Sequence, residues 1–311
     1  MKLSQLVYQR NLLEKQDIRT LKQSGLMDLS QILYLVDNFK VENPIKKLQD
    51  DYASISEAYD LFYSHFDDLK QKLNAMIREQ EPEYYRLSSE LYLEGRAYET
   101  PEYILHRVLK VDTATAELFK SRVDMRADWR LPALIIRPGD EIWIRNLIAF
   151  DPLYIADTHK DLLIPCQQQF PEAYQRRMMT YVLDESKENI TTDLPNDQFG
   201  LMFVYNFFNF KPLEIIKKYL TELFYKLRPG GVLVMTLNDC DHEHGVMLVE
   251  NKYAPYTPLR EVLAIANQVG YELVYRNSDL GTLTWLELGR PGKITSLRGG
   301  QTLAKIIDKP Q

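Results

Sequence analysis

The stretch Leu227-Arg-Pro-Gly-Gly-Val-Leu-Val234 decides the fold of the second half of the chain. Apolar residues at helical spacing precede it, from Pro212 to Leu227. Gly230 and Gly231 allow a tight reversal, because glycine adopts backbone conformations that other residues avoid. The apolar run from Val232 to Thr236 then has the composition of a buried strand. The stretch therefore predicts a helix, a turn and a strand in immediate succession.

The same alternation of helix and strand extends from this stretch in both directions. A strand–helix alternation predicts a parallel sheet covered by helices on both faces. The last two strands are joined by a short polar link, so we expect them to form an antiparallel hairpin. The expected strands are residues 131–137, 153–156, 179–183, 199–205, 232–236, 271–275 and 282–288. The expected helices are residues 140–150, 160–178 (broken near Pro165 or Pro171), 212–227 and 257–269, with a long polar loop up to about residue 256.

The first half of the chain has helical period almost throughout, and one apolar pattern in it is unusually regular. Asn43 and Pro44 form a good helix start, a capping side chain followed by proline at the first helical position. From there, apolar and aromatic residues alternate at spacings of 3 and 4, which is a heptad pattern. Pro82 should stop the helix, which is expected over residues 44–80. The pattern residues are Ile45, Leu48, Tyr52, Ile55, Tyr59, Phe62, Phe66, Leu69, Leu73 and Met76.

The seam of this long helix must be covered, and two arrangements are open. Helices within residues 3–35 and 83–125 can fold back over it. Alternatively, a second copy of the chain covers it in a coiled coil or a bundle of helical hairpins. The aromatic seam residues suit a multi-helix bundle better than a slim two-stranded coil. We expect the second arrangement, a homo-oligomer held by the N-terminal helices. Shorter helices are expected at residues 83–94, 100–110 and 113–123.

Composition places the chain among ordinary globular proteins, with 45% hydrophobic and 26% charged residues. No apolar run is long enough to span a bilayer, and the N-terminus has no signal-peptide pattern. We therefore expect a cytoplasmic protein without a membrane partner. Cys166 and Cys240 are too few for a disulfide framework or a zinc site, and no metal site is expected. The net charge of -6 is shared evenly between the halves, which argues against extended nucleic acid as a partner.

The order of elements, five strand–helix units followed by a terminal strand pair, resembles the class I S-adenosylmethionine-dependent methyltransferase fold. Leu-x-Pro-Gly-Gly-x-Leu after an amphipathic helix looks like the turn before the fifth strand of that family. The resemblance implies an α/β domain with a Rossmann-like, doubly wound, mostly parallel seven-stranded sheet, preceded by an all-α helical or coiled-coil domain. The expected domains are a helical oligomerisation domain at 1–128, a methyltransferase-like domain at 129–292 and a tail at 293–311.

The resemblance also places the cofactor, S-adenosyl-L-methionine, at the carboxyl ends of the strands, where ligands bind in open α/β sheets. The first loop, Arg137-Pro138-Gly139, would let its backbone approach the cofactor. It holds one glycine where the family usually has two or three, and Arg137 stands where the family more often has an acid. No Gly-x-Gly-x-x-Gly follows any strand and no P-loop motif occurs, so an NAD, FAD or P-loop enzyme is disfavoured.

Three acids after strands are implied as further cofactor-binding residues. Asp157 ends the second strand and would accept hydrogen bonds from both ribose hydroxyls, because a carboxylate accepts on two oxygens. Alternatively, it caps the helix that begins near His159. Asp184 or Glu185, after the third strand, would face the adenine amino group. A solvated loop acid is the alternative for both.

Tyr205 and Asn206, at the end of the fourth strand, are the candidate catalytic residues. Methyl transfer is an in-line displacement at a sulfonium, so it depends on positioning, and aromatic faces favour cations. Asn206 could orient the acceptor; the alternative is that the aromatics here pack under the next helix. The polar segment Asn238–His244 holds two histidines and could serve the substrate or be a solvated loop, with a metal least favoured.

Two functions of different class remain open. One is an active methyltransferase acting on a small molecule, a protein or a short nucleic-acid end. No Asn-Pro-Pro-aromatic run of the amino-group DNA methylases is present. The alternative is a non-catalytic assembly protein that retains a methyltransferase-like fold, which the glycine-poor first loop and the long seam motivate.

Overall fold

The computed structural model describes residues 2–14, 44–93, 113–138, 150–168, 170–280 and 283–293. Contacts within the chain divide it into two units, Met1–Tyr84 and Tyr85–Gln311. Each unit is described by itself. The division falls earlier than the domain boundary expected after residue 128. The second unit therefore includes the last turns of the long helix as well as α6 (Thr113–Asp124).

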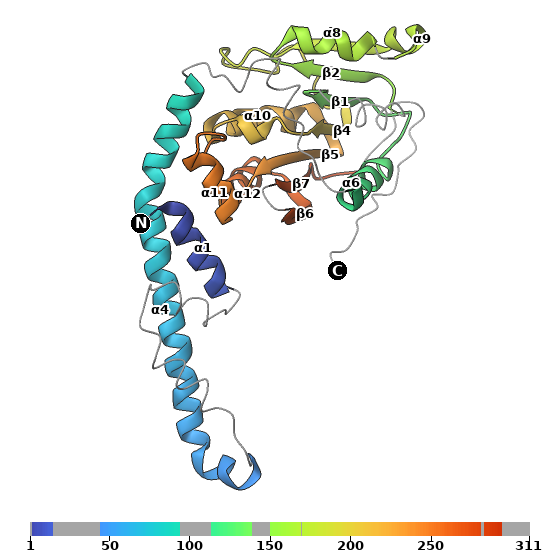
Figure 1. The fold of residues 1–311 in the computed structure, drawn as a ribbon. Helices are drawn as coiled ribbons and strands as arrows, with labels where there is room; N and C mark the ends of the chain where they lie inside the picture. Colours follow the sequence, from blue (N-terminus) through green and yellow to red (C-terminus); the bar gives the residue numbers. More distant parts are fainter. Residues whose placement is uncertain are drawn as a thin grey trace. The chain divides into compact units, whose positions relative to one another are not determined.

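The second unit is built on a seven-stranded sheet with the order β3-β2-β1-β4-β5-β7-β6 (Figure 1). Strands β1 to β5 pair in parallel, whereas β7 is antiparallel to both of its neighbours. The expected mostly parallel α/β sheet with a terminal antiparallel pair is therefore confirmed. The strands are β1 Ala133–Ile136, β2 Leu153–Asp157, β3 Met178–Val182, β4 Phe199–Val204, β5 Leu227–Asn238, β6 Glu272–Leu280 and β7 Leu283–Gly289.

Each face of the sheet carries its own hydrophobic core. Alternate residues of β1 divide between the two, Leu134 and Ile136 on one face and Ala133 and Ile135 on the other, because successive strand side chains point in opposite directions. The first core includes residues of α10 (Leu213–Lys226) and α12 (Leu259–Val269), and the second includes residues of α6 and α8 (Lys160–Gln168). The remaining helices are α9 Glu172–Gln175, η2 Phe208–Phe210 and α11 Glu243–Glu250.

The segment that decides the fold is strand rather than turn. β5 begins at Leu227, immediately after α10, so the prediction of a turn at Arg228–Gly231 was wrong. Gly230 has φ 83°, in the region that favours glycine. A Cβ on Gly231 would lie 2.6 Å from the carbonyl oxygen of Phe199. The glycines therefore serve an irregular strand start that lies close against β4.

Two further predictions in the second unit need correction. The polar loop expected after β5 contains α11, because Val246 and Val249 give residues 243–250 a buried face. The helix expected over residues 160–178 is broken at Pro171, one of the two places predicted, whereas Pro165 lies inside α8; α8 ends at Gln168, and α9 ends at Gln175 rather than at residue 178. β3 then begins at Met178. The helices expected at residues 100–110 and 140–150 lie outside the described residues.

The first unit contains α1 (Leu3–Glu14) and most of α4 (Pro44–Leu93). α4 begins at Pro44 as predicted but continues through Pro82, so the predicted end was wrong. A proline inside a helix removes one hydrogen bond and adds a clash, a cost that contacts of the following turns can offset. Those turns make several polar contacts, described below. Residues 15–43 lie outside the described part of the chain.

The buried positions of α4 also differ from the heptad prediction at one place. Leu69 and Leu73 are buried as predicted, whereas Met76 is 39% exposed and Ile77 is 2% exposed. Each step of four residues rotates the buried side by about 40° around a helix of 3.6 residues per turn, so the buried side leaves the line of a strict heptad here. Within the described residues, no helix combines the length and the apolar character needed to cross a membrane.

Candidate functional site

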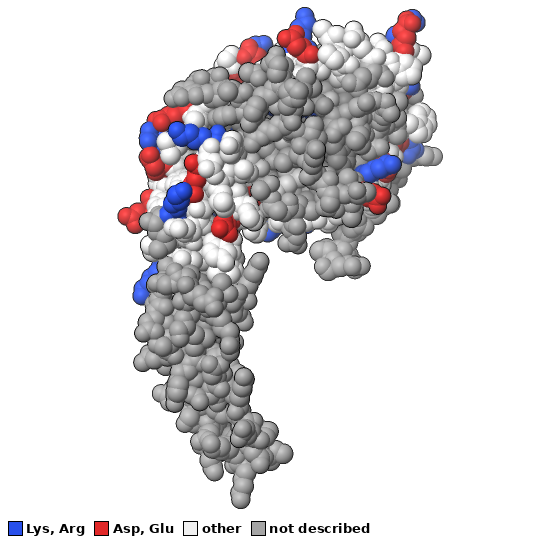
Figure 2. Space-filling model, viewed as in Figure 1, with Lys and Arg blue, Asp and Glu red and all other residues white. Residues whose placement is uncertain are grey.

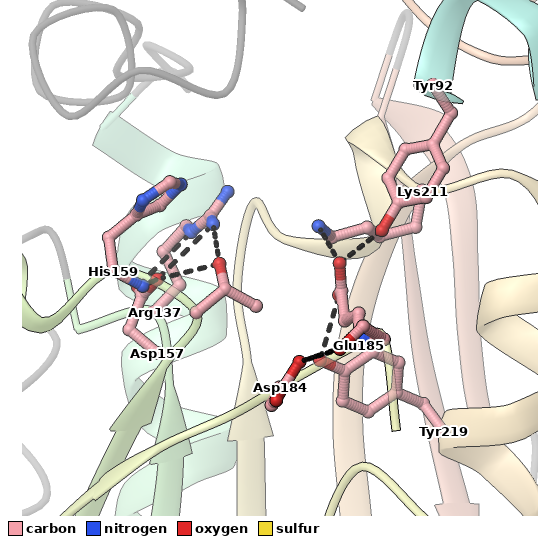
Figure 3. A network of polar contacts seen from close by, with 10 residues as sticks. Tyr92, Arg137, Asp157, His159, Asp184, Glu185, Lys211 and Tyr219 are labelled. Carbon is pink, nitrogen blue, oxygen red and sulfur yellow. Dashed lines mark hydrogen bonds and ion pairs between the residues drawn. The ribbon is translucent and has the colours of Figure 1, made fainter. Parts of the chain in front are cut away.

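The candidate site lies at the carboxyl ends of β1, β2 and β4. Chain order in the sheet runs outward from β1 to β2 and β3 on one side, and from β4 to β5 on the other. Ligands of open α/β sheets bind outside the carboxyl ends of the strands where the order reverses in this way. Figure 3 shows that the polar side chains at this edge form two groups, one around Asp157 and one around Glu185.

Arg137 and Asp157 form the first group. Arg137 follows β1 with φ 60°, an uncommon backbone conformation for a non-glycine residue. Its Nε lies 3.3 Å from Asp157 Oδ2 and its Nη2 lies 3.4 Å from Asp157 Oδ1. The Asp157 carboxylate is 0% exposed and also accepts from the His159 backbone N–H at 3.0 Å and the Thr158 hydroxyl at 3.3 Å. Both carboxylate oxygens are therefore engaged by this chain itself.

Three donors surround Glu185 in the second group. Lys211 Nζ lies 2.9 Å from Glu185 Oε2, and the Tyr219 hydroxyl donates to Oε1 at 2.9 Å. The Tyr92 hydroxyl, from the last turn of α4, also donates to Oε2. Burial, and then the nearby Glu185 charge, raise the pKa of Tyr219 well above its ordinary value, so this hydroxyl remains a donor. Lys211 is fully buried, and Glu185 balances its charge.

Phe207 joins the two groups. The Arg137 guanidinium carbon lies 4.7 Å from the Phe207 ring centroid, and Lys211 Nζ lies 4.8 Å from it. Both distances are within the range of cation–π attraction. The ring itself is fully buried and packs edge-on against Tyr219. The edge of the sheet thus holds two buried cations on one aromatic ring, each paired with a carboxylate.

Of the two acids predicted after β3, Glu185 and not Asp184 points into this network (Figure 3). Asp184 Oδ1 accepts from the Ser186 hydroxyl at 2.6 Å and from its backbone N–H at 3.0 Å. These hydrogen bonds lower the pKa of Asp184, with the side-chain bond contributing most. Asp184 therefore stabilises a local turn.

The two candidate catalytic residues lie in different surroundings. Tyr205 is buried in the second core and stacks on Phe203 with ring centroids 6.1 Å apart. Asn206 is half-buried and has φ 54°. Its backbone N–H donates to Thr236 Oγ1 at 2.8 Å. The placement of Tyr205 favours packing, whereas the backbone at Asn206 is of the strained kind that clusters at functional sites.

A buried polar network connects the ends of β4 and β5. The Thr236 hydroxyl donates to Asn209 Oδ1 at 3.0 Å, and Asn209 Nδ2 donates to Asn238 Oδ1 at 3.1 Å. Asn238 Nδ2 in turn donates to the Asn209 backbone carbonyl at 3.1 Å. These side chains hold the segment after β4 against β5, and so fix the position of Asn206.

The loop after β5 is organised by its own acids. Asp239 Oδ1 accepts from the backbone N–H of Asp241 at 2.8 Å and of Leu259 at 3.1 Å. His242 precedes α11, and His244 lies exposed in its first turn, so the two histidines do not share one side of an extended segment. Burial raises the pKa of the Cys240 thiol. Across the described ranges, no group of three or more His, Cys, Asp or Glu side chains is placed to hold a metal ion.

Among the other predicted site residues, Pro138 follows Arg137 at the end of β1, and Gly139 lies outside the described residues. Sequence reasoning missed Tyr92, Lys211 and Tyr219. A lysine directly after a run of aromatic residues was the available signal for Lys211. Tyr92 gave none, because it lies 93 positions from the acid that it contacts.

The residue types at this edge fit an adenosine group in their chemistry. Asp157 and Glu185 provide acceptor oxygens at the ends of neighbouring strands, as two hydroxyls and an amino group require. In this structure these oxygens accept from Arg137 and Tyr92, among other donors. Where Figure 2 shows described residues, acidic and basic side chains lie next to one another.

The strand order, with β7 alone running antiparallel to its neighbours, is that of the class I methyltransferase fold. The chain has this fold. A carboxylate stands at the end of β2 and another just after β3, where the resemblance places the cofactor contacts.

Three solved structures show the extent of the similarity to known proteins. An O-methyltransferase family protein from Burkholderia thailandensis is 12% identical, with 69% of this chain and 70% of that chain covered at a TM-score of 0.46. An S-adenosylmethionine-dependent methyltransferase from Mesorhizobium loti is 11% identical, with 58% and 100% covered and a TM-score of 0.45. The N-methyltransferase NodS from Bradyrhizobium japonicum is 13% identical, with 58% and 98% covered and a TM-score of 0.43. No protein-family model and no curated protein matches the sequence. The fold assignment rests on the strand order and directions of the chain itself.

Proposed function

We propose that this chain is an S-adenosylmethionine-dependent methyltransferase that acts on a small-molecule or protein acceptor. The observation that carries the proposal is the pair of carboxylates, Asp157 at the end of β2 and Glu185 after β3. Both lie at the edge of the sheet where the strand order reverses. Ligands of open α/β sheets bind at this point. The cofactor would supply the methyl group as a sulfonium substituent.

The residues of the chain would divide the binding task between them. Asp157 would accept hydrogen bonds from the two ribose hydroxyls, and Glu185 would accept one from the adenine amino group. Asn206, fixed by Thr236 and the asparagine network behind it, would present its side chain to the acceptor. Pre-organised positioning of this kind is the main protein contribution to an in-line displacement.

The test is isothermal titration with S-adenosylhomocysteine, the reaction product, which requires no acceptor. We expect wild type to bind it, and Asp157→Asn and Glu185→Gln to lose at least about 10-fold in affinity, since each weakens an acceptor of a polar ligand group. Glu172→Ala is the matched control, because Glu172 is an exposed acid that pairs with the exposed Arg176. If neither the wild type nor an Arg137→Gln variant gives heat at millimolar ligand, the proposal is contradicted.

A second candidate function is a non-catalytic assembly protein, and one specific observation favours it. Arg137 replaces the acid expected at the end of β1 and neutralises Asp157 in a fully buried ion pair. A site completed by its own side chains requires no ligand for stability. Under this alternative, neither the wild type nor an Arg137 variant binds S-adenosylhomocysteine.

A further inference from the structure

The two carboxylates that the proposed function assigns to adenosine both accept hydrogen bonds from donors of the same chain. Arg137 takes those of Asp157, and Tyr92 takes one of Glu185. The two donors come from different elements, one from the end of β1 and one from the end of α4. Figure 3 shows them on the two sides of the same sheet edge, each pointing at its carboxylate.

Arg137 presents to Asp157 the pattern that a ribose would present. Two N–H groups face the two carboxylate oxygens, as two neighbouring hydroxyls would. The distances of 3.3 and 3.4 Å are longer than the 2.7–2.9 Å typical of charge-assisted hydrogen bonds. Asp157 keeps the His159 N–H and the Thr158 hydroxyl when Arg137 leaves. The ion pair is therefore replaceable at moderate cost.

Tyr92 presents to Glu185 a flat aromatic ring with a donor at its edge, as an adenine with its amino group would. Its ring packs against the first core and lies 5.3 Å from Lys211 Nζ. The helix end that carries it is anchored in the second unit. Ser88 Oγ accepts from the backbone N–H of Tyr256 at 2.7 Å, and Tyr85 packs edge-on against the Tyr256 ring.

We infer that the chain closes its own cofactor site, with Arg137 and Tyr92 occupying the adenosine contacts until the ligand displaces them. This inference rests on the proposed function. Binding then requires Arg137 to leave Asp157 and the end of α4 to release Tyr92 from Glu185. The affinity of the wild type for the cofactor is lowered by the cost of both steps, since only the open state is competent to bind.

The experiment is titration of wild type, Tyr92→Phe, Arg137→Gln and the double variant with S-adenosylhomocysteine. Tyr92→Phe keeps the ring and removes the hydroxyl, so we expect a rise in affinity of about 5- to 10-fold. Arg137→Gln removes the competing charge and should give about 10-fold or more. Tyr85→Phe is the matched control, a tyrosine hydroxyl on the same helix that does not contact Glu185, and should leave the affinity unchanged.

Hydrogen exchange provides a second measurement that does not depend on a variant. If the ligand displaces Tyr92, saturating S-adenosylhomocysteine should speed exchange of the amides of residues 85–93 in wild type. If wild type binds the ligand with no change in exchange at residues 85–93, and the variants bind no better than wild type, the inference is overturned. The proposed function then still stands. If wild type and every variant fail to bind, both are overturned.

Discussion

Two buried carboxylates of the same sheet, Asp157 and Glu287, are each paired with arginine but are held differently. Glu287 lies in the middle of β7 and receives Arg122 and Arg126 from α6 and its following turn. Trp285 Nε1 donates to it at 3.0 Å. Asp157 is the last residue of β2, and its carboxylate oxygens lie 3.3 and 3.4 Å from Nε and Nη2 of Arg137. Both acids are 0% exposed, so burial alone does not distinguish a structural ion pair from one at a ligand site.

The position in the sheet explains the difference. A mid-strand acid such as Glu287 is covered on its face by a helix, and its partners attach that helix to the sheet. The guanidinium of Arg122 also lies 3.4 Å from the ring centroid of Tyr275, which fixes it further. An acid at a strand end, such as Asp157, faces the region where chain segments leave the sheet and ligands approach. We therefore expect the Glu287 cluster to contribute stability and the Asp157 pair to control binding.

The largest expected effect is that of Glu287→Ala. It leaves two arginines at a buried site without their carboxylate, a change that typically costs about 3–5 kcal/mol of unfolding free energy. Urea unfolding followed by circular dichroism measures this cost, with Glu172→Ala as the surface control. A loss no larger than that of the control would mean that water reaches α6 and replaces the pair.

The contribution of Glu287 to the unfolding free energy should depend on pH. Burial alone would raise the pKa of the Glu287 carboxyl, but the hydrogen bond from Arg122 and the charge of Arg126 hold it below the ordinary value of 4.5. The folded state thus binds this proton more weakly than the unfolded chain. The resulting stability is complete above 4.5 and is lost as the pH falls through the lowered pKa.

Glu287→Gln removes this titrating group. Its unfolding free energy should therefore change less than that of wild type between about pH 6 and about pH 3. The same urea experiment repeated at several pH values measures the two slopes. Parallel slopes for the two proteins would contradict the assignment of acid sensitivity to Glu287.

The sheet could be predicted from sequence because its strands are short apolar runs bounded by glycine, proline or acids. The same reasoning failed where residues lie in secondary structure that their average preferences disfavour. Gly230 and Gly231 continue a strand instead of turning, and the apolar residues 246–249 of α11 follow a polar segment that predicted a loop. Pro82 lies inside a helix that local preference would end.

The candidate site could be predicted only in part. Acids after strands are visible in sequence, and Asp157 and Glu185 both lie at the expected edge of the sheet. Their partners were not predictable, since Tyr92 comes from a helix 93 positions away and the direction of Arg137 depends on its φ of 60°. Self-association through the α4 seam stays a prediction, which light scattering of the whole chain tests.

Arg137→Gln should have a smaller effect on stability than Glu287→Ala and a larger one on binding. Asp157 retains two other donors, so we expect a loss of about 1–3 kcal/mol of unfolding free energy. Arg122→Gln is the matched variant, an arginine whose carboxylate lies in the sheet interior. It should leave the affinity for S-adenosylhomocysteine unchanged. Equal binding changes in both variants would mean that the gain reflects general loosening rather than release of Asp157.

The smallest expected effect is that of Ser88→Ala. The Ser88 hydroxyl is the acceptor that holds the Tyr256 backbone N–H at 2.7 Å and so anchors the end of α4. Its removal should cost about 1 kcal/mol of unfolding free energy, as for a single neutral hydrogen bond. Because Tyr92 keeps its hydroxyl but is held less firmly, the affinity for S-adenosylhomocysteine should rise by less than in Tyr92→Phe. A larger rise than in Tyr92→Phe would mean that the whole end of α4, rather than the Tyr92 hydroxyl alone, controls access to Glu185.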